Sequence, residues 1–349
     1  METKIIDWKD ASLAVSALKS GEAVCFPTET VYGIGVLSTK KEYFDKLVKL
    51  KNRPADKPFT LMCSCLTQVA IHCKLNARII SVMKSFMPGE ITLILDAREG
   101  EEDYLSLSTG KLGVRVPNSL PVLDMIEKAG APLLVPSANK SGLKPSLSSK
   151  EAFDYFNGEV PYVIDGNCVS NIPSTIVDLS NNQISLVREG KIPFEEIKKV
   201  YDSTPSTISI GADHGAFALK GDIINHLKDM GFNVLDEGTY SLESCDYPIF
   251  AKKVAEDITS KKASLGIVCC TSGIGISIAC NKVRGIRCGV GYDDVVVGKC
   301  REHNNCNIIS FGAAYMKKED VLRRVDIFLS EKFSPLEKHH RRVNEIEDI

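Results

Sequence analysis

From Thr207 onward, segments typical of strands alternate regularly with segments typical of helices. A helical segment follows each of five candidate strands: TISIGA (207–212), NVLDEG (233–238), LGIVCC (265–270), IRCGV (286–290) and IISFG (308–312). This order predicts a doubly wound parallel sheet of about five strands, an α/β fold with helices on both faces. Ligands of such sheets bind beyond the carboxyl ends of the strands, so the residues that follow those ends are the first candidates for function.

The stretch GIVCCTSGIGISIACNK (266–282) contains the clearest chemical signal of this half. It predicts a strand over 266–270, a glycine-containing loop over 272–275 and a helix over 276–282. Such a loop presents consecutive main-chain N–H groups ahead of a helix N-terminus. These groups attract negative charge, either on a phosphate or on an oxyanion that forms during a reaction.

Cys270 lies where this strand ends. A free cysteine in an apolar run is most often a buried core residue, and that interpretation suits Cys269, which should face the opposite way into packing. A thiol beside a helix N-terminus and a series of amides can instead have its pKa lowered to roughly 3.5–7.5, which makes it a usable general base. We therefore assign the chemistry to Cys270 and a structural role to Cys269.

The length and charge of the chain limit its class. A chain of 349 residues suggests two domains, because single hydrophobic cores rarely grow beyond roughly 250–300 residues. The net charge of −2 argues against a protein that coats nucleic acid or membranes by charge alone. The start METKIIDWKD lacks the apolar core of a signal peptide, and no run approaches the roughly 20 apolar residues that cross a bilayer. We expect a cytoplasmic protein without a membrane partner.

The twelve cysteines are scattered along the chain without a CxxC pair. Zinc sites and disulfide frameworks both have characteristic cysteine spacings, and neither spacing is present in this sequence. We therefore expect reduced, mostly structural thiols and no bound metal.

The first half carries a series of short motifs in a fixed order. They are PTETVYGIG (27–35), KNRPADKPF (51–59), PGEIT (88–92), GVRVP (113–117), PSANKSG (136–142), PSTIVD (173–178) and VREG (187–190). Together they resemble the YrdC-type threonylcarbamoyl-AMP synthases over nearly all of residues 5–195. The resemblance implies a twisted α/β fold with a positive groove. It also implies a reaction that joins L-threonine, bicarbonate and ATP, which enters with Mg²⁺, and releases pyrophosphate, the product passing to a tRNA threonylcarbamoyltransferase.

The residue types of these motifs suit that reaction. Four basic side chains would neutralise the carbamate and the triphosphate: Lys51, Arg53, Arg115 and Arg188. On the resemblance, the threonine pocket would be lined by Thr28, Thr30 and Tyr32, with Arg115 on the threonine carboxylate. The adenylate would be held by Ser137, Asn139 and Ser174. Attack of a carbamate on the α-phosphate needs no strong base, so positioning would supply most of the catalysis.

The second half carries its own series of motifs. They are GADHGAF (211–217), DEGTY (236–240), DYP (246–248), CTSGIGISIACNK (270–282), GIR (285–287), EHNNCN (302–307), FG (311–312) and HHRRVNEIE (339–347). They resemble type B ribose-5-phosphate isomerases over residues 207–349, a wider family that includes galactose- and allose-6-phosphate isomerases. The resemblance implies aldose–ketose isomerisation of ribose 5-phosphate through an enediolate, without a cofactor.

The resemblance also implies roles for single residues. Cys270 would move the proton between C1 and C2, Ser272 would assist at a hydroxyl, and Asp213 and His303 would open the sugar ring. Phosphate would be bound by His214, Lys338 and Arg342, the last two lying four residues apart on one helix face. Further contacts to the sugar phosphate would come from Tyr247, Thr271, Gly273, Gly275 and Asn304. In this family His303 and its neighbours come from the partner subunit, so we expect a homodimer through this half.

Three residues depart from the family patterns. Glu90 stands where proline is usual, and because a carboxylate facing the triphosphate would repel ATP, we expect Glu90 to point to solvent. Thr271 stands where glycine is usual. Lys338 stands where arginine is common, which keeps the charge but loses bidentate geometry.

The leading hypothesis is a bifunctional enzyme with domains at 1–198 and 207–349, joined by a linker at 199–206. One alternative is a first domain that binds structured RNA as a scaffold, which RNA binding without pyrophosphate release would favour. Another is a degenerate isomerase fold that serves only for dimerisation, which the departures at Thr271 and Lys338 motivate. Measurement of catalysis by each half separates these two alternatives from the bifunctional enzyme. A third is an isomerase that acts on allose or galactose 6-phosphate.

Overall fold

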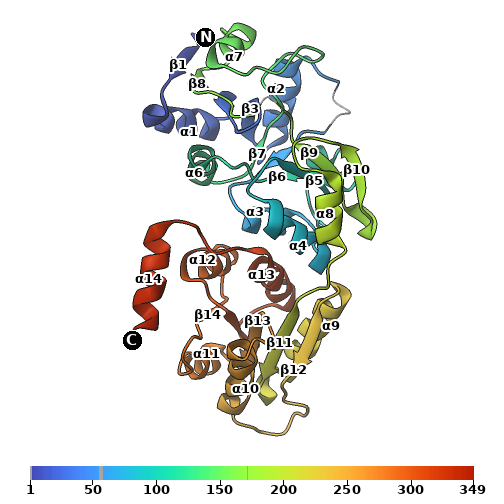
Figure 1. The fold of residues 1–349 in the computed structure, drawn as a ribbon, viewed down its shortest axis with the longest axis vertical. Coiled ribbons are helices and arrows are strands. Elements are labelled where there is room, and N and C mark those ends of the chain that lie inside the picture. Colours follow the sequence, from blue (N-terminus) through green and yellow to red (C-terminus); the bar gives the residue numbers. More distant parts are fainter. Residues whose placement is uncertain (1, 55–57, 171) are drawn as a thin grey trace. The chain divides into compact units, whose positions relative to one another are not determined.

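The computed structural model describes residues 2–54, 58–170 and 172–349, so the middle of the KNRPADKPF motif lies outside the described residues. The chain forms two compact units (Figure 1). The first comprises the chain up to Lys74 together with Ser85–Tyr201, and the second comprises Leu75–Lys84 and Asp202–Ile349. The sequence-based division treated 1–198 as continuous, whereas the contacts group Leu75–Lys84 with the second unit. None of the helices in the described ranges is long and apolar enough to cross a membrane.

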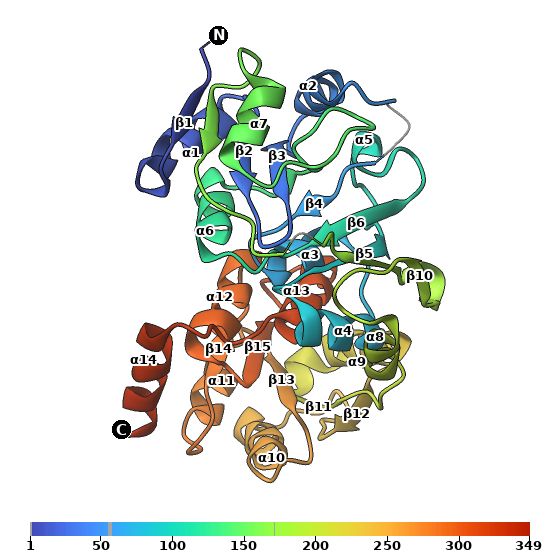
Figure 2. The same cartoon turned by 45° about the horizontal axis from the view of Figure 1, so that its top comes forward.

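Within the described residues, the first unit is built on a mixed sheet of ten strands in the order β1-β8-β2-β3-β7-β4-β6-β5-β9-β10. The strands are β1 (Lys4–Ile6), β2 (Val24–Pro27), β3 (Tyr32–Leu37), β4 (Leu61–Met62), β5 (Ile91–Asp96), β6 (Lys111–Arg115), β7 (Leu133–Leu134), β8 (Tyr162–Ile164), β9 (Thr175–Asp178) and β10 (Ser185–Arg188). Figure 2 shows the central strands spread from β2 through β3, β4 and β6 to β5. Several predicted site residues lie at or next to the ends of β2, β6 and β7 and the start of β9. These four strands belong to one sheet, although they are far apart in sequence.

Helices cover this sheet. They are α1 (Ala11–Lys19), α2 (Lys41–Lys51), α3 (Leu66–His72), α5 (Asp103–Ser106), α6 (Leu120–Ala129), α7 (Ser149–Phe156) and α8 (Phe194–Tyr201), while α4 (Ala77–Phe86) belongs to the second unit up to Lys84. Gly130 ends α6 in the left-handed conformation at φ 91°, which glycine adopts without a steric penalty.

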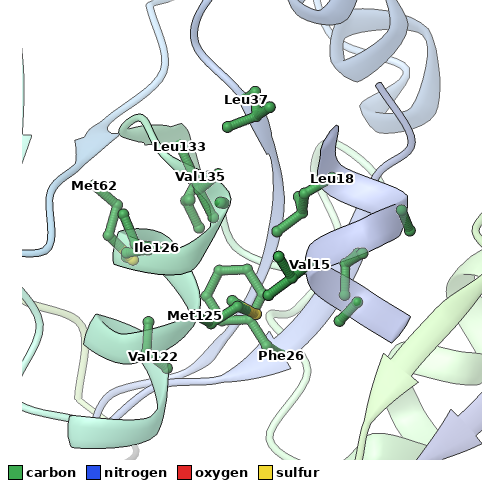
Figure 3. Close-up of a cluster of buried hydrophobic side chains, with 14 of the residues drawn as sticks. Val15, Leu18, Phe26, Leu37, Met62, Val122, Met125, Ile126, Leu133 and Val135 are labelled. Carbon is green, nitrogen blue, oxygen red and sulfur yellow. The ribbon is translucent and has the colours of Figure 1, made fainter. Parts of the chain in front are cut away.

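A cluster of buried side chains fixes the position of strand β2. Val15 from α1 and Met125 from α6 pack against Phe26 of β2 (Figure 3). Each fully buried apolar side chain of this size contributes about 1.5–3 kcal/mol. The cluster therefore holds the strand whose carboxyl end leads into the PTETVYGIG motif.

The second unit is a parallel five-stranded sheet in the order β12-β11-β13-β15-β14, as the sequence predicts. The strands are β11 (Thr207–Ala212), β12 (Asn233–Asp236), β13 (Leu265–Cys270), β14 (Cys288–Val290) and β15 (Ile308–Gly312). The helices that follow are α9 (Phe217–Asp229), α10 (Tyr247–Thr259), α11 (Ile274–Cys280), α12 (Asp294–Asn304), α13 (Lys318–Ser330) and α14 (Glu337–Glu347). Helix α10 contacts α11, and α13 contacts both α9 and α12, which gives a helical layer on each face (Figure 1).

The predicted boundaries of one helix were wrong. Helix α11 begins at Ile274, two residues before the predicted start, and it ends at Cys280 rather than at Lys282. Gly273, at φ 78°, is the residue before the helix, so Ile274 and Gly275 already form its first turn. At the other end, Asn281 exchanges two hydrogen bonds with the main chain of Cys288, at 2.8 and 2.9 Å, which turns the chain toward β14.

Candidate active sites

Cys270 occupies the last position of β13 and is 4% exposed. The main-chain N–H of Gly273 donates a hydrogen bond to its sulfur at 3.1 Å. This contact fixes the position of the sulfur at the carboxyl end of the strand. Its neighbour Cys269 is fully buried, and burial raises the pKa of the Cys269 thiol. Both thiols are buried, and Cys270 accepts the N–H of Gly273 while it packs against Ile276 of helix α11.

Asp213 lies at the end of the neighbouring strand β11 and is 6% exposed. Its main-chain N–H donates to the carbonyl of Cys269 at 3.2 Å, which places it beside the end of β13. Its Oδ1 atom is buried and has no hydrogen-bond partner. An unpaired buried carboxylate oxygen is costly, so this atom is available to a ligand hydroxyl.

His214 has a defined tautomer. The main-chain N–H of Cys245 donates to Nδ1 of His214 at 3.2 Å, so Nδ1 is the acceptor and the ring proton lies on Nε2. The Nε2–H group is then available to donate to an anion. Cys245 was not among the residues that sequence reasoning selected, and nothing local in the sequence signals a main-chain contact 31 residues away.

Two glycines leave room for the side chains of Thr271 and Tyr247 to pack closely against neighbouring main chain at this edge. A Cβ atom on Gly215 would lie 2.4 Å from Oγ1 of Thr271, so the Thr271 side chain rests directly on the turn that follows Asp213. A Cβ atom on Gly275 would lie 2.7 Å from the ring of Tyr247, so the ring packs against the first turn of α11. We name Cys270, Asp213, His214, Thr271 and Tyr247 the carboxyl-edge cluster.

The other candidate residues of this unit lie on two helices in contact with each other. His303 and Asn304 are the last residues of α12, and Lys338 and Arg342 are exposed on α14. The rings of His303 and His339 stack with centroids 4.2 Å apart. Burial and, next, the neighbouring His303 lower the pKa of His339. We name His303, Asn304, Lys338 and Arg342 the helical cluster.

The structure does not bring these two clusters together within one chain. Cys270 pairs with Gly312 at the carboxyl ends of β13 and β15. Helix α12 runs back to the amino ends, where the N–H of Gly266 donates to the carbonyl of Asn307 at 2.9 Å. His303 therefore lies near the amino ends of the strands, whereas Cys270 lies at their carboxyl ends. At 3.3 Å per residue, the length of the strand separates them by about 16 Å.

In the first unit, Arg115 forms a buried ion pair that sequence reasoning missed. Its Nη2 group donates to Oε1 of Glu29 at 2.8 Å and to Oγ1 of Thr30 at 3.0 Å. Oε1 of Glu29 also accepts from the N–H of Asn118 at 3.0 Å. Oε2 of Glu29 and Nε of Arg115 are buried without partners. Arg115 and Thr30 are thus in contact, and Glu29 positions the guanidinium.

The two other residues predicted for that pocket are held by their own contacts. Oγ1 of Thr28 lies 3.0 Å from Oγ1 of Thr30 and donates to the carbonyl of Val31 at 2.7 Å. Tyr32 is fully buried, and its hydroxyl donates to the carbonyl of Gly166 at 2.7 Å. Burial raises the pKa of Tyr32. Tyr32 therefore braces the start of β3 rather than presenting its hydroxyl to an open surface.

Lys51 is 3% exposed at the end of α2. Its ammonium group donates to the carbonyls of Ser137 and Asn139, each at 2.5 Å, and to Oδ1 of Asn139 at 3.1 Å. Burial, and then the nearby Arg53, lower the pKa of Lys51 to about 8. Lys51 therefore holds the loop that carries Ser137 and Asn139, with all three of its donors in use.

Arg53 and Arg188 are the other two of the four basic residues that the sequence predicts to neutralise the substrates. Arg53 donates to the carbonyl of Pro58 at 3.1 Å and lies 5.1 Å from the ring centroid of Phe59. Arg188 donates through Nη2 to the carbonyl of Ser174 at 2.8 Å. Partial burial and, next, the charge of Arg115 lower the pKa of Arg188.

The expectation that Glu90 points to solvent is wrong. The Glu90 side chain is 13% exposed, and Oε1 accepts from Nζ of Lys191 at 2.8 Å. Its Oε2 atom is buried without a partner. Lys191 is 101 residues away in sequence but close in space, and its positive charge holds the Glu90 carboxylate against the protein.

Comparison with known proteins identifies both halves. The Sua5/YciO/YrdC family model, described as Telomere recombination, matches residues 16–190, half of the chain. The LacAB/RpiB model, described as Ribose/Galactose Isomerase, matches residues 208–346. The chain is a fusion of these two families. This confirms the two resemblances and the α/β fold class that the sequence predicts.

Individual relatives cover the two halves separately. Threonylcarbamoyl-AMP synthase of Pyrococcus abyssi is 32% identical over 199 residues, 56% of this chain, and the chain spans only 58% of that relative's length. Ribose-5-phosphate isomerase B of Escherichia coli is 37% identical over 142 residues, which is 41% of this chain and 95% of that protein. A solved structure of a P. abyssi Sua5 variant matches with a TM-score of 0.54 at 23% identity, over 79% of this chain and 94% of that one, which shows the fold alone.

Proposed function

We propose that this fusion is a bifunctional enzyme that makes threonylcarbamoyl-AMP with its first half and isomerises ribose 5-phosphate with its second. The observation that carries the isomerase half is the Gly273 N–H bond to the Cys270 sulfur, beside the unpartnered carboxylate oxygen of Asp213. A sulfur held in place by a main-chain N–H group, together with a carboxylate that can accept a proton from a hydroxyl group, supplies the groups that proton transfer between adjacent carbons needs.

In the proposed isomerisation, the Cys270 thiolate removes the proton from C2 of the open-chain aldose and returns it to C1. Main-chain N–H groups of the Thr271–Gly275 loop hold the negative oxygen of the enediolate, and Ser272 assists at a hydroxyl. Asp213 accepts a proton from a ring hydroxyl, and His303 supplies one to open the ring. No cofactor takes part.

We infer that the site is completed by a second copy of the chain. The carboxyl-edge cluster contains the base, whereas the helical cluster contains the ring-opening histidine and two phosphate-binding cations, and one chain holds them at opposite edges of its sheet. The partner's copy of the helical cluster would supply the missing groups. Ile274 and Ile278, one turn apart on α11 and 57% and 55% exposed, supply apolar surface for such a dimer.

In the proposed synthase half, MgATP, threonine and bicarbonate are substrates. Arg115 binds the threonine carboxylate, and Thr28 and Thr30 shape the pocket around it. Arg188 and Arg53 offset the charge that accumulates as the carbamate approaches the α-phosphate, while Ser137, Asn139 and Ser174 hold the adenylate. Pyrophosphate leaves, and the product goes to a tRNA threonylcarbamoyltransferase in the cytoplasm.

The full-length protein tests both halves in separate assays. We expect pyrophosphate release that requires threonine, bicarbonate and ATP together, and conversion of ribose 5-phosphate to ribulose 5-phosphate faster than conversion of allose or galactose 6-phosphate. Faster turnover of a hexose phosphate would change the proposed sugar. Absence of turnover with every sugar would leave the second half as a dimerisation module. RNA binding without pyrophosphate release would replace the synthase proposal by a scaffold.

The low pKa of Lys51 predicts a pH dependence of ATP binding. As pH rises through about 8, Lys51 loses its proton and one of the donors that hold Ser137 and Asn139. We expect the KM for ATP in pyrophosphate release to increase across this range, with kcat less affected. Lys51→Arg keeps its charge to much higher pH. A KM that rises equally in the wild type and in Lys51→Arg would exclude Lys51 as the cause.

A further inference from the structure

A groove of about 830 Å³ lies between the end of α11, strand β14 and the last residues of α14. Three thiols line it, from Cys288, Cys300 and Cys306, together with Arg284 and Arg287. All three cysteines are free. The reactions proposed above use none of these groups, although the groove also includes Asn304 of the helical cluster.

Two of these thiols are direct neighbours. The N–H of Cys306 donates to the carbonyl of Cys300 at 2.9 Å, because Asn305, at φ 48°, turns the chain back after α12. Both sulfurs lie close to Gly289. A Cβ atom on Gly289 would be 2.6 Å from the sulfur of Cys300 and 3.5 Å from the sulfur of Cys306. The absence of a side chain at Gly289 leaves room for this pair of sulfurs.

The two sulfurs differ in their ease of ionisation. A hydrogen bond from the Cys306 thiol lowers the pKa of Cys300. The same hydrogen bond, followed by burial, raises the pKa of Cys306. Cys300 is therefore the sulfur that ionises first, and Cys306, which is 6% exposed, is placed to attack it after oxidation.

We propose that Cys300 and Cys306 form a reversible disulfide with hydrogen peroxide as the oxidant, and that this bond switches off the isomerase by moving His303 and Asn304. The Cys300 thiolate attacks one peroxide oxygen, the O–O bond breaks, and the departing hydroxide takes a proton to become water. The Cys306 sulfur then displaces the hydroxyl of the resulting sulfenic acid, which leaves as a second water. A small dithiol reverses the reaction by thiol–disulfide exchange.

The position of this pair connects it to the proposed active site. His303 and Asn304 lie between the two cysteines, and the turn that joins them is held by Nη1 of Arg301, which donates to Oδ1 of Asn305 at 3.2 Å. A disulfide draws the two sulfurs to about 2.05 Å and closes a ring that contains His303, whose side chain stacks on His339, so we expect the bond to shift this segment. The regulatory part of the inference rests on the proposed isomerase function.

The chemical step is tested on the full-length protein by peroxide treatment, blocking of free thiols and mass spectrometry of the peptides. We expect a Cys300–Cys306 disulfide that dithiothreitol removes. Cys306→Ser should stop at a sulfenic acid on Cys300 that dimedone traps, and Cys300→Ser should give neither product at this position. Cys65→Ser, which removes a partly exposed thiol of the first unit, should behave as the wild type. A disulfide between other cysteines, or none, overturns the proposal.

The regulatory step has two readouts. We expect oxidation to shift the NMR signals of the His303 ring and to lower turnover by up to about 10²-fold, the cost of a misplacement of about 1 Å, with recovery after reduction. Peroxide can also attack Cys270, so the double variant Cys300→Ser, Cys306→Ser is the control and should keep its activity. Equal loss in that variant, or an unshifted His303 signal in the disulfide form, overturns the switch. If the reduced protein turns over no sugar phosphate, the proposed isomerase function fails. The disulfide and the shift of the His303 signal can still be measured in that case, and they decide whether the disulfide forms and moves His303.

Discussion

Cys270→Ala is expected to lower isomerase turnover by about 10²–10⁴-fold, the usual contribution of a general base. The Cys270 sulfur lies at the end of β13 and accepts the N–H of Gly273, so the sulfur has a fixed position at the carboxyl edge. Alanine removes the group that would move the proton but leaves the loop of amides intact. Exchange of the C2 hydrogen with solvent should fall in parallel with turnover, because both pass through the enediolate.

Cys269→Ala is the matched control for this variant. Cys269 is the adjacent thiol, fully buried and with a raised pKa, and its removal should affect packing without removing a base. We expect turnover near the wild-type value in Cys269→Ala at a temperature where both variants are folded. Near-normal turnover in folded Cys270→Ala would remove Cys270 from the role of the base.

Glu29→Gln is expected to destabilise the first unit by about 3–5 kcal/mol, because it leaves the charge of Arg115 buried without its partner. The pair is 7–8% exposed, so solvent screens it little. The glutamine amide oxygen could still accept a hydrogen bond from Arg115, as Thr30 does, but it carries no negative charge to offset that of the guanidinium. Denaturant unfolding, followed by a probe in the first unit, measures the change.

A double variant separates the loss of the ion pair from the loss of packing. Glu29→Gln combined with Arg115→Met removes both charges, so it should be more stable than Glu29→Gln alone. If the double variant is less stable than the single one, the uncompensated charge is not the cause. Glu29→Gln with wild-type stability would show that the pair contributes little to folding.

Local sequence patterns were sufficient for much of the second unit. Regular alternation of strands and helices predicts the parallel sheet, and the two-residue period of a strand separates Cys269 from Cys270. The predicted start of α11 is wrong because glycine is typical of loops, whereas Gly275 lies in the first turn of the helix, beside the ring of Tyr247. The candidate residues of this unit lie at both ends of the strands, because α12 runs back along the sheet from the carboxyl ends to the amino ends.

In the first unit the errors concern partners that are distant in sequence. Glu29 and Arg115 are 86 residues apart, Lys51 holds a loop 86 to 88 residues away, and Glu90 meets Lys191 across 101 residues. No periodicity or motif spacing encodes such pairs, because they depend on how the ten strands are ordered. The motifs predicted which residue types matter, and only the fold showed which of them position the others.

A complementation assay most directly tests the claim that the isomerase site is shared between two chains. Cys270→Ala and His303→Ala are purified separately, mixed in equal amounts, dissociated and reassociated. Half of the dimers are then mixed, and each mixed dimer has one site with both residues intact, so we predict recovery of about one quarter of wild-type turnover. If both residues act within one chain, every site lacks one of them, and the mixture stays as inactive as the separate variants.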